Sequence, residues 1–142
     1  KNEAFRLFQE SIKQLQEIGD TWFLAQGLNQ LGYFAISNGD NSLAKKSFKQ
    51  AFSIAMDNNA IPNILDSLTG LALLSIHPEQ YFKTMKVAVF VIQHQASTWE
   101  TKQRAEKLKS QLNPLLSAQE IENAYTVVAS SNLETFTHEW IE

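Results

Sequence analysis

The histidines and carboxylates of this sequence are the side chains best suited to catalysis or metal binding, so their spacing is considered first. A metal site or a general acid–base site needs several such groups to converge. His77, His94 and His138 are widely separated along the chain, and Glu134 stands four residues before His138. An enzyme using His138, Glu134 and neighbouring acids is therefore the least favoured alternative. The sequence predicts no catalytic residue, no metal site and no cofactor.

The common motifs for nucleophilic and phosphate chemistry are also missing from the sequence. There is no Gly-x-Ser-x-Gly elbow to hold a nucleophilic serine, and no Gly-x-x-x-x-Gly-Lys-Ser/Thr loop to bind a nucleotide. The chain has no cysteine, which removes thiolate catalysis and disulfides together. These observations predict a protein that is not an enzyme.

Composition and charge restrict the partners and the compartment. The formal net charge is −3, so no positive field is available to hold DNA or RNA, and the basic run Lys102, Arg104, Lys107 and Lys109 is interleaved with Glu100 and Glu106. The longest apolar stretch, residues 87–92, is too short to cross a bilayer. We therefore expect no direct nucleic-acid binding and no membrane insertion, and the absence of cysteine favours the cytoplasm.

The elements that would position any functional group follow from a repeat of about forty residues. Phe8, Leu28 and Leu31 recur forty positions later as Phe48, Leu68 and Leu71. Apolar periodicity and helix-boundary residues predict an all-α fold with helices over residues 3–18, 21–37, 42–56, 62–76, 79–95, 98–112, 118–130 and 133–141.

Turn and capping residues agree with these boundaries. Gly19 and Gly39 are each followed by aspartate, which predicts a helix end at positive φ and then a capped helix start. Pro62 suits a first helical turn, because its missing N–H has no partner there anyway. Ser117 and Glu120 form a Ser-x-x-Glu capping box. The predicted helices are therefore bounded by residues that end one helix and start the next.

A resemblance to a known repeat family rests on the residues between 28 and 51. Leu28, Leu31, Gly32, Ala35, Ala44, Phe48 and Ala51 fall at the spacings of the tetratricopeptide motif, so this segment resembles a tetratricopeptide repeat. The resemblance implies a right-handed superhelix of antiparallel helical hairpins, an α-α solenoid of about eight helices.

Under this resemblance the whole chain, 1–142, is one helical repeat domain. Residues 1–18 would be the second helix of a truncated repeat, 20–58 a repeat, 60–95 a degenerate repeat and 97–142 carboxy-terminal capping helices. Small residues such as Gly32 and Ala44 would let helices approach, and Phe48 would fill the gap between hairpins. The aromatic residues at helical spacing are predicted to lie in the core: Trp22, Phe23, Phe34, Phe48, Phe52, Phe82 and Phe90.

A longer resemblance concerns the parent protein. Segments 17–22, 25–32, 121–125 and 132–136, with the Gly39-Asp40 turn, look like the carboxy-terminal repeats of large bacterial signal-transduction ATPases and of maltose-activator-type, LuxR-like transcription regulators. The resemblance implies that a signal sensed on the repeats switches an upstream nucleotide-binding module, sometimes with a DNA-binding module elsewhere. Because the chain opens within a helical pattern, it is expected to be a segment of such a protein.

The resemblance also selects a candidate binding surface. Tetratricopeptide hairpins direct the first helix of each unit toward the concave side, which here would expose Gln26, Asn29, Tyr33, Ile36, Asp66, Thr69, Leu73 and Ile76. This surface lacks the cations that grip a terminal carboxylate. We expect a protein or peptide partner, which includes other domains of the parent chain. The alternative is a small neutral ligand such as a sugar, and the sequence leaves open both a homo-oligomer and a face that contacts only solvent or other repeats.

Overall fold

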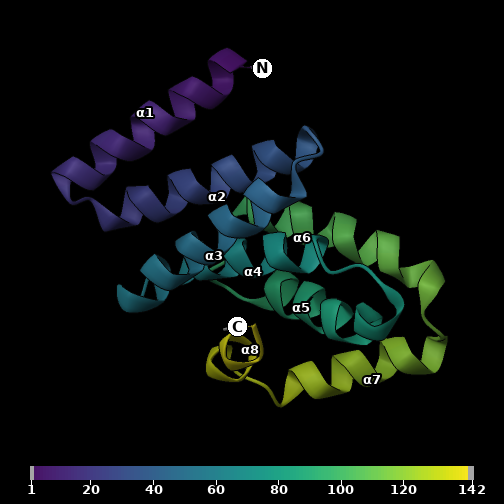
Figure 1. Cartoon of the computed structure of the whole chain (residues 1–142). Helices are drawn as coiled ribbons and strands as arrows, with labels where there is room; N and C mark the ends of the chain where they lie inside the picture. Colours follow the sequence, from purple (N-terminus) through teal and green to yellow (C-terminus); the bar gives the residue numbers. More distant parts are fainter. Residues whose placement is uncertain (1, 141–142) are drawn as a thin grey trace. The chain divides into compact units, whose positions relative to one another are not determined.

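The computed structural model describes residues 2–140, and this part of the chain contains helices and no strand. The elements are α1 (Asn2–Ile18), α2 (Thr21–Ser37), α3 (Asn41–Asp57), α4 (Ile61–Leu73), α5 (Tyr81–Gln93), α6 (Trp99–Leu112), α7 (Ala118–Ala129) and α8 (Leu133–Trp140), with short 3-10 helices at Pro78–Gln80 and Asn113–Leu115 (Figure 1). The predicted all-α class and the eight α-helices are confirmed for the described residues. Whether the hairpins form a superhelix stays a prediction.

The boundaries of the predicted helices are close to those observed, with one difference between α4 and α5. The fourth helix ends at Leu73 instead of residue 76, and α5 begins at Tyr81 after the Pro78–Gln80 turn. His77 has the extended φ and ψ angles that a following proline imposes, which explains the break. The last residue predicted in the eighth helix, 141, lies outside the described residues.

The chain divides into two compact units, Lys1–Leu71 and Ala72–Glu142, which we call unit 1 and unit 2. The boundary falls inside α4, within the segment 60–95 that the sequence assigns to a degenerate repeat.

The two tight turns of unit 1 have the predicted geometry. Gly19 and Gly39 have φ angles of 81° and 76°, in the left-handed region that glycine adopts without strain. The side chain of Asp20 accepts a hydrogen bond from Phe23 N at 3.1 Å, and that of Asp40 accepts one from Leu43 N at 3.0 Å. These contacts fix the ends of α2 and the start of α3.

The core of unit 1 is built around the ring of Phe48 on α3, which is fully buried. The ring lies between two glycines, since a Cβ atom added to Gly32 of α2 would lie 2.6 Å from it and one added to Gly70 of α4 would lie 2.3 Å from it. Tyr33 contacts the same ring edge-on, with the ring centroids 4.8 Å apart. The predicted role of Phe48 and Gly32 is confirmed, whereas Gly70 was not foreseen.

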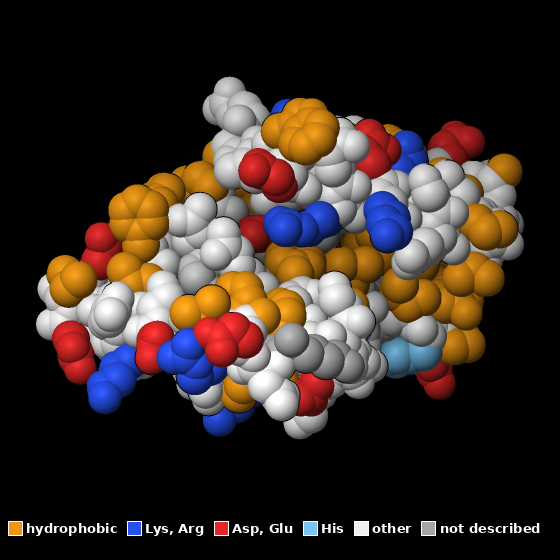
Figure 2. Space-filling view, turned by 90° about the horizontal axis from the view of Figure 1, so that it is seen from above, with side chains coloured by type: hydrophobic (Ala, Val, Ile, Leu, Met, Phe, Trp, Pro, Cys, Tyr) orange, Lys and Arg blue, Asp and Glu red, His pale blue; other side chains and the backbone are white. Residues whose placement is uncertain are grey.

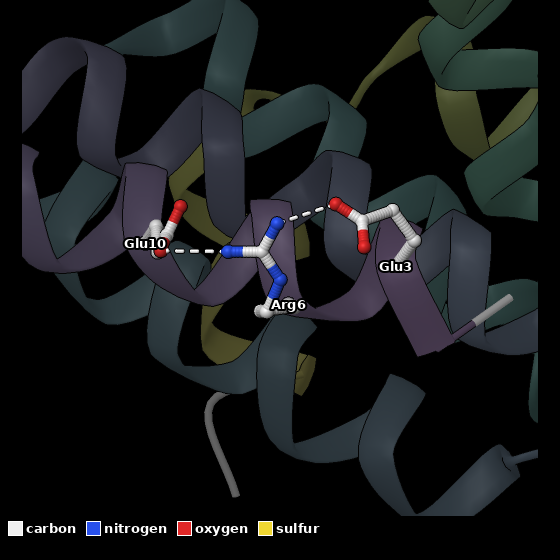
Figure 3. Close-up of polar contacts among 3 residues, drawn as sticks. All are labelled: Glu3, Arg6 and Glu10. Atoms are coloured by element: carbon white, nitrogen blue, oxygen red, sulfur yellow. Dashed lines mark hydrogen bonds and ion pairs between the residues drawn. The ribbon is translucent and has the colours of Figure 1, made fainter.

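Helix α1 covers one side of unit 1 without burying any residue fully. Its Ile12 and Leu15 pack against a cluster that includes Leu24 and Leu28 of α2. On its exposed side, Arg6 forms ion pairs with Glu3 and Glu10, one turn before it and one turn after it (Figure 3). Exposed pairs of this kind stabilise a helix by only about 0.2–0.5 kcal/mol each, so packing on α2 holds α1 in place.

Unit 2 is organised around α5, which contacts both α6 and α7. Its core includes aliphatic side chains from these three helices, together with one ring from α5 and one from α8: Met85, Val87, Ala88, Val89, Phe90, Val91, Ala105, Leu108, Leu112, Ala124, Val128 and Phe136. The predicted capping box is present, because Ser117 Oγ accepts from Glu120 N and Glu120 accepts from Ser117 N. The side chain of Asn132 caps α8 by accepting from Thr135 N.

Two of the aromatic residues assigned to the core by sequence are on the surface. Phe48, Phe52 and Phe90 are buried as expected, but Trp22 and Phe23 are 46% and 53% exposed. The buried stripe of α2 runs through Leu24, Leu28, Leu31 and Ala35. Phe23 and Trp22 precede Leu24 by one and two residues, which turns them about 100° and 200° away from Leu24 around the helix.

Basic and acidic side chains are interspersed on the face drawn in Figure 2, and hydrophobic side chains are exposed between them. Among the described helices, none is long and apolar enough to cross a membrane.

Candidate partner-binding surface on α2 and α4

Asn29, one of the residues expected to face a partner, is completely buried in unit 1. Its Nδ2 donates to the backbone oxygen of Asn63 at 3.1 Å, and its Oδ1 accepts from Ser67 Oγ at 2.8 Å. Both partners lie on α4. The prediction that Asn29 is exposed is therefore wrong, because its amide is used to join α2 to α4.

Further hydrogen bonds extend this junction along the two helices. Asn63 Nδ2 donates to the backbone oxygen of Trp22 at 3.2 Å. At the other end, the hydroxyl of Tyr33 donates to the backbone oxygen of Asp66 at 2.8 Å and lies 3.1 Å from Asp66 Oδ1. We call Asn29, Tyr33, Asn63, Asp66 and Ser67 the polar seam. A buried donor or acceptor that loses its partner costs about 1–3 kcal/mol, so the seam fixes how α4 lies along α2.

Thr69 is also buried, and its exposure was wrongly predicted. Its Oγ1 donates to the backbone oxygen of Leu65 at 2.8 Å within α4, a bond that leaves the hydroxyl turned inward. Ile36, Leu73 and Ile76 are half-buried. Of the predicted surface, only Gln26 is freely exposed, while Tyr33 and Asp66 are half-buried and bonded to each other.

The surface of α2 that faces solvent combines Gln26 and Tyr33 of the predicted surface with Trp22 and Phe23, which were predicted to be buried, and with Gln30. Trp22, Gln26 and Gln30 are spaced by four residues and are exposed, with Phe23 beside them and half-buried Tyr33 at the far end. We call these five residues the α2 ridge. A signal for it was present in the sequence, because α2 contains no charged residue and its solvent-facing side must then be made of uncharged groups.

The α2 ridge offers hydrogen bonding and apolar contact without charge. The indole of Trp22 can donate one hydrogen bond, and each glutamine amide can both donate and accept. Aromatic rings supply large contact areas at a small loss of conformational entropy. None of the five side chains titrates near neutral pH, so the α2 ridge can bind a neutral partner but provides no acid or base.

The histidines lie on separate segments of the described structure. His77 Nδ1 is 3.0 Å from Glu79 Oε2, and this hydrogen bond lowers the pKa of Glu79 below its ordinary value. His94 Nδ1 accepts from Ala96 N at 3.0 Å. His138 and Glu134 are both exposed on α8. Among residues 2–140, no three histidine or carboxylate side chains are grouped so that they could hold a metal ion.

A hollow elsewhere in unit 1 bears on the choice between a small ligand and a larger partner. It has a volume of about 230 Å³ and lies between Phe5, Phe34, Asn38 and Leu43. Pockets for small molecules usually have about 300–1,000 Å³, and this hollow falls below that range. This hollow is therefore smaller than a usual small-molecule site.

Comparisons of this chain with protein-family models, with curated proteins and with solved structures gave no match.

Proposed function

We propose that this chain is a non-catalytic protein–protein interaction module of the tetratricopeptide type, and that the α2 ridge is its contact surface. The observation that carries the proposal is the exposure of Trp22 and Phe23, beside the exposed amide of Gln26, on a helix with no charge. Aromatic residues of this kind dominate the binding energy of many protein interfaces.

The rigidity of α2 supports this proposal. The helix is covered by α1 and α3 and is bonded to α4 through the polar seam. A rigid surface loses little conformational freedom when a partner binds, which improves affinity for a given set of contacts. The buried Asn29 thus contributes to recognition by positioning the α2 ridge, without touching the partner.

The chemistry of the α2 ridge indicates the kind of partner. Without a cation it offers no strong site for a terminal carboxylate, and half-buried Asp66 lies at its far end, bonded to Tyr33. An uncharged peptide segment, extended or helical, would use the glutamine amides for its backbone and the rings of Trp22 and Phe23 for an apolar side chain.

The parent arrangement is part of the same proposal. We infer that the module belongs to a larger bacterial regulatory or signal-transduction protein in the cytoplasm, as the resemblance of its repeats implies. Its partner is then a separate protein or another domain of the parent chain.

A peptide selection tests the contact surface directly. Random peptides displayed on phage are selected on the immobilised chain, and the binders are measured against Trp22→Ala/Gln26→Ala and against Trp99→Ala. Trp99 is the matched control, because its side chain is 72% exposed on α6 of unit 2. We expect the double variant to lose binding and the control to keep it; equal binding to all three proteins would remove the α2 ridge as the contact surface.

A second function, the sensing of a small neutral ligand such as a sugar, is favoured by the combination of rings and amides. Sugars stack on aromatic faces and form hydrogen bonds with amide side chains, as Trp22 and Gln26 would allow. A ligand that binds only the folded chain raises the melting temperature by mass action. A screen of neutral mono- and disaccharides in which none shifts the melting temperature would exclude this alternative for those sugars.

A further inference from the structure

Helix α8 of unit 2 contacts α5 through an aromatic stack and through polar contacts of two lysines. Phe136 of α8 is 2% exposed, and its ring stacks on that of Phe90 with the centroids 4.3 Å apart and the planes inclined by 20°. Phe90 is itself buried on α5. This stack is an anchor of the kind that inserts into a hydrophobic groove when an amphipathic helix binds.

Two lysines of α5 contact the acidic end of α8, which follows this anchor in the sequence. Lys83 Nζ lies 4.4 Å from the ring centroid of Trp140 and donates to the backbone oxygen of Glu139 at 3.3 Å. Lys86 Nζ lies 3.7 Å from Glu139 Oε2. Lys83, Lys86 and Phe90 are spaced along one side of α5, so they form a face with an apolar end and a basic end, which we call the α5 face.

The contacts of α8 are those of a segment that can leave. The helix has eight residues, fewer than a helix needs to persist in water by itself, and only residues 130–132 connect it to α7. The Lys86–Glu139 contact is long, and the carboxylate is 36% exposed, so salt screens it. The indole Nε1 of Trp140 is buried and finds no acceptor among the described residues, which weakens the docked state.

The α5 face also continues beyond the part that α8 covers. A hollow of about 390 Å³ opens beside Phe90 and is bounded by His94 of the α5–α6 turn and Val128 of α7. Since Ser131 of the segment leading to α8 also borders the hollow, a helix longer than α8 would find further surface there.

We propose that the α5 face is a second recognition site, which takes an amphipathic helix, and that α8 is its built-in occupant. The helix it takes carries an aromatic anchor, an acidic residue three positions later and an aromatic residue next to the acid, as Phe136, Glu139 and Trp140 do. A partner helix with this pattern displaces α8, so α8 inhibits the site until the partner arrives. This site is separate from the α2 ridge and does not depend on the function proposed for it.

The experiment uses a fluorescent synthetic peptide of residues 131–140 and the full chain. In the wild-type chain, α8 competes with the peptide, and the apparent affinity is reduced by the fraction of molecules whose α5 face is open. In the Phe136→Ala chain the α5 face is intact but its occupant is weakened. We expect that chain to bind the peptide at least about tenfold more tightly than wild type, measured by fluorescence anisotropy.

Three controls decide the outcome. A peptide with alanine in place of its phenylalanine should not bind, and Lys83→Glu/Lys86→Glu in the Phe136→Ala chain should abolish the gain. Glu139→Lys keeps Phe136 but weakens the contact of α8 with Lys86, so it should also raise peptide affinity. This second variant keeps the proposal testable if Phe136→Ala disturbs folding. Circular dichroism shows whether each variant is folded. The proposal is overturned if neither folded variant binds the peptide more tightly than wild type. A wild-type dimer that excess peptide dissociates would overturn the assignment to a foreign helix, because α8 of a second copy would fill the α5 face.

Discussion

The two units use their central phenylalanines in different ways. In unit 1, Phe48 is enclosed between Gly32 and Gly70, so the helices on both sides are shaped to its ring. In unit 2, Phe90 stacks on Phe136, which is carried by an eight-residue helix. A ring held between two backbones cannot leave without separating helices, whereas a ring stacked on an eight-residue helix can be uncovered when that helix undocks.

The polar contacts of the two units differ in the same sense. The seam of unit 1 uses Asn29 and Ser67, which are buried and hydrogen-bonded to each other. The contact between α5 and α8 in unit 2 uses Lys86, whose side chain is 15% exposed, and Glu139, whose side chain is 36% exposed. Buried hydrogen bonds impose a large penalty when one partner is lost, and an ion pair whose carboxylate is reached by water imposes a smaller one. Unit 1 is thus suited to hold a rigid binding surface, and unit 2 to exchange an occupant.

The largest expected change in stability comes from removing Phe48, and comparison with Phe136 tests whether the two rings are held differently. Phe48→Ala should lower the free energy of unfolding by about 3–5 kcal/mol, because it removes a fully buried ring between two helices. Phe136→Ala should have a smaller effect on global unfolding, since α8 can undock locally. Urea denaturation of both variants measures the difference. Equal losses would contradict the contrast between an interlocked ring and a detachable one.

The two glycines of α2 provide a sharper test of how tightly Phe48 is enclosed. Alanine is favoured over glycine inside a helix by about 1 kcal/mol, and overpacking a core costs about 1–3 kcal/mol. Gly32→Ala places a methyl group against Phe48 and should destabilise unit 1, whereas at Gly27 the new methyl would lie an ordinary 3.7 Å from Leu15. Gly27→Ala should therefore be neutral or stabilising.

Thermal melts of the two alanine variants measure this difference: Gly32→Ala should lower the melting temperature, and Gly27→Ala should leave it unchanged or raise it. Combining Gly32→Ala with Phe48→Leu should relieve part of the loss, because the smaller side chain leaves room for the added methyl group. A Gly32→Ala variant as stable as Gly27→Ala would show that Phe48 is loosely packed.

Asn29 tests the polar seam. Asn29→Ala leaves Ser67 Oγ and the Asn63 carbonyl without their partner on α2, and should cost about 1–3 kcal/mol. Gln26 is three residues earlier on the same helix and is exposed, so Gln26→Ala should change stability by no more than about 0.5 kcal/mol. Chemical denaturation measures the free energy of unfolding of both variants. Similar small losses of stability in both would mean that the polar seam does not hold α4 on α2.

The smallest expected effect concerns a polar contact in unit 2. A hydrogen bond from Lys109 to Tyr125 raises the pKa of Lys109 above its ordinary value. A raised pKa in the folded state means that the contact stabilises the protein below the ordinary lysine pKa of about 10.4 and is lost as the pH rises through the folded-state value. Lys109 is half-buried at the surface and water screens the contact, so the contribution should be at most a few tenths of a kcal/mol. The stability difference between wild type and Lys109→Met should therefore shrink as the pH rises above about 10.4.

The sequence predicted the elements of both units well because their signals are local. The glycines at 19 and 39, the aspartates after them and the Ser117 capping box each act within a few residues, and all have the expected geometry. Phe48 was predicted to be buried from its spacing and its recurrence. Local signals of this type are sufficient to place helices and their ends.

The sequence did not reveal which polar residues are buried, because that depends on distant partners. Asn29 has a polar side chain of a type that is usually exposed, and its partners Asn63 and Ser67 follow 34 and 38 positions later. Gly70 was missed for a related reason, since the forty-residue period pairs it with Gln30, which is not a small residue. The predicted surface therefore shares Gln26 and Tyr33 with the α2 ridge, but it included Asn29 and Thr69, which are buried.

The central claim is that the α2 ridge contacts the partner, and the three tryptophan indoles of the chain can test it in one experiment. Trp22 lies on the α2 ridge, Trp99 on α6 and Trp140 on α8, so each indole N–H signal in a ¹H–¹⁵N NMR spectrum reports a different surface. On titration with a selected peptide, the Trp22 signal should shift while the Trp99 signal stays in place. A shift confined to Trp99 or Trp140 would contradict the account.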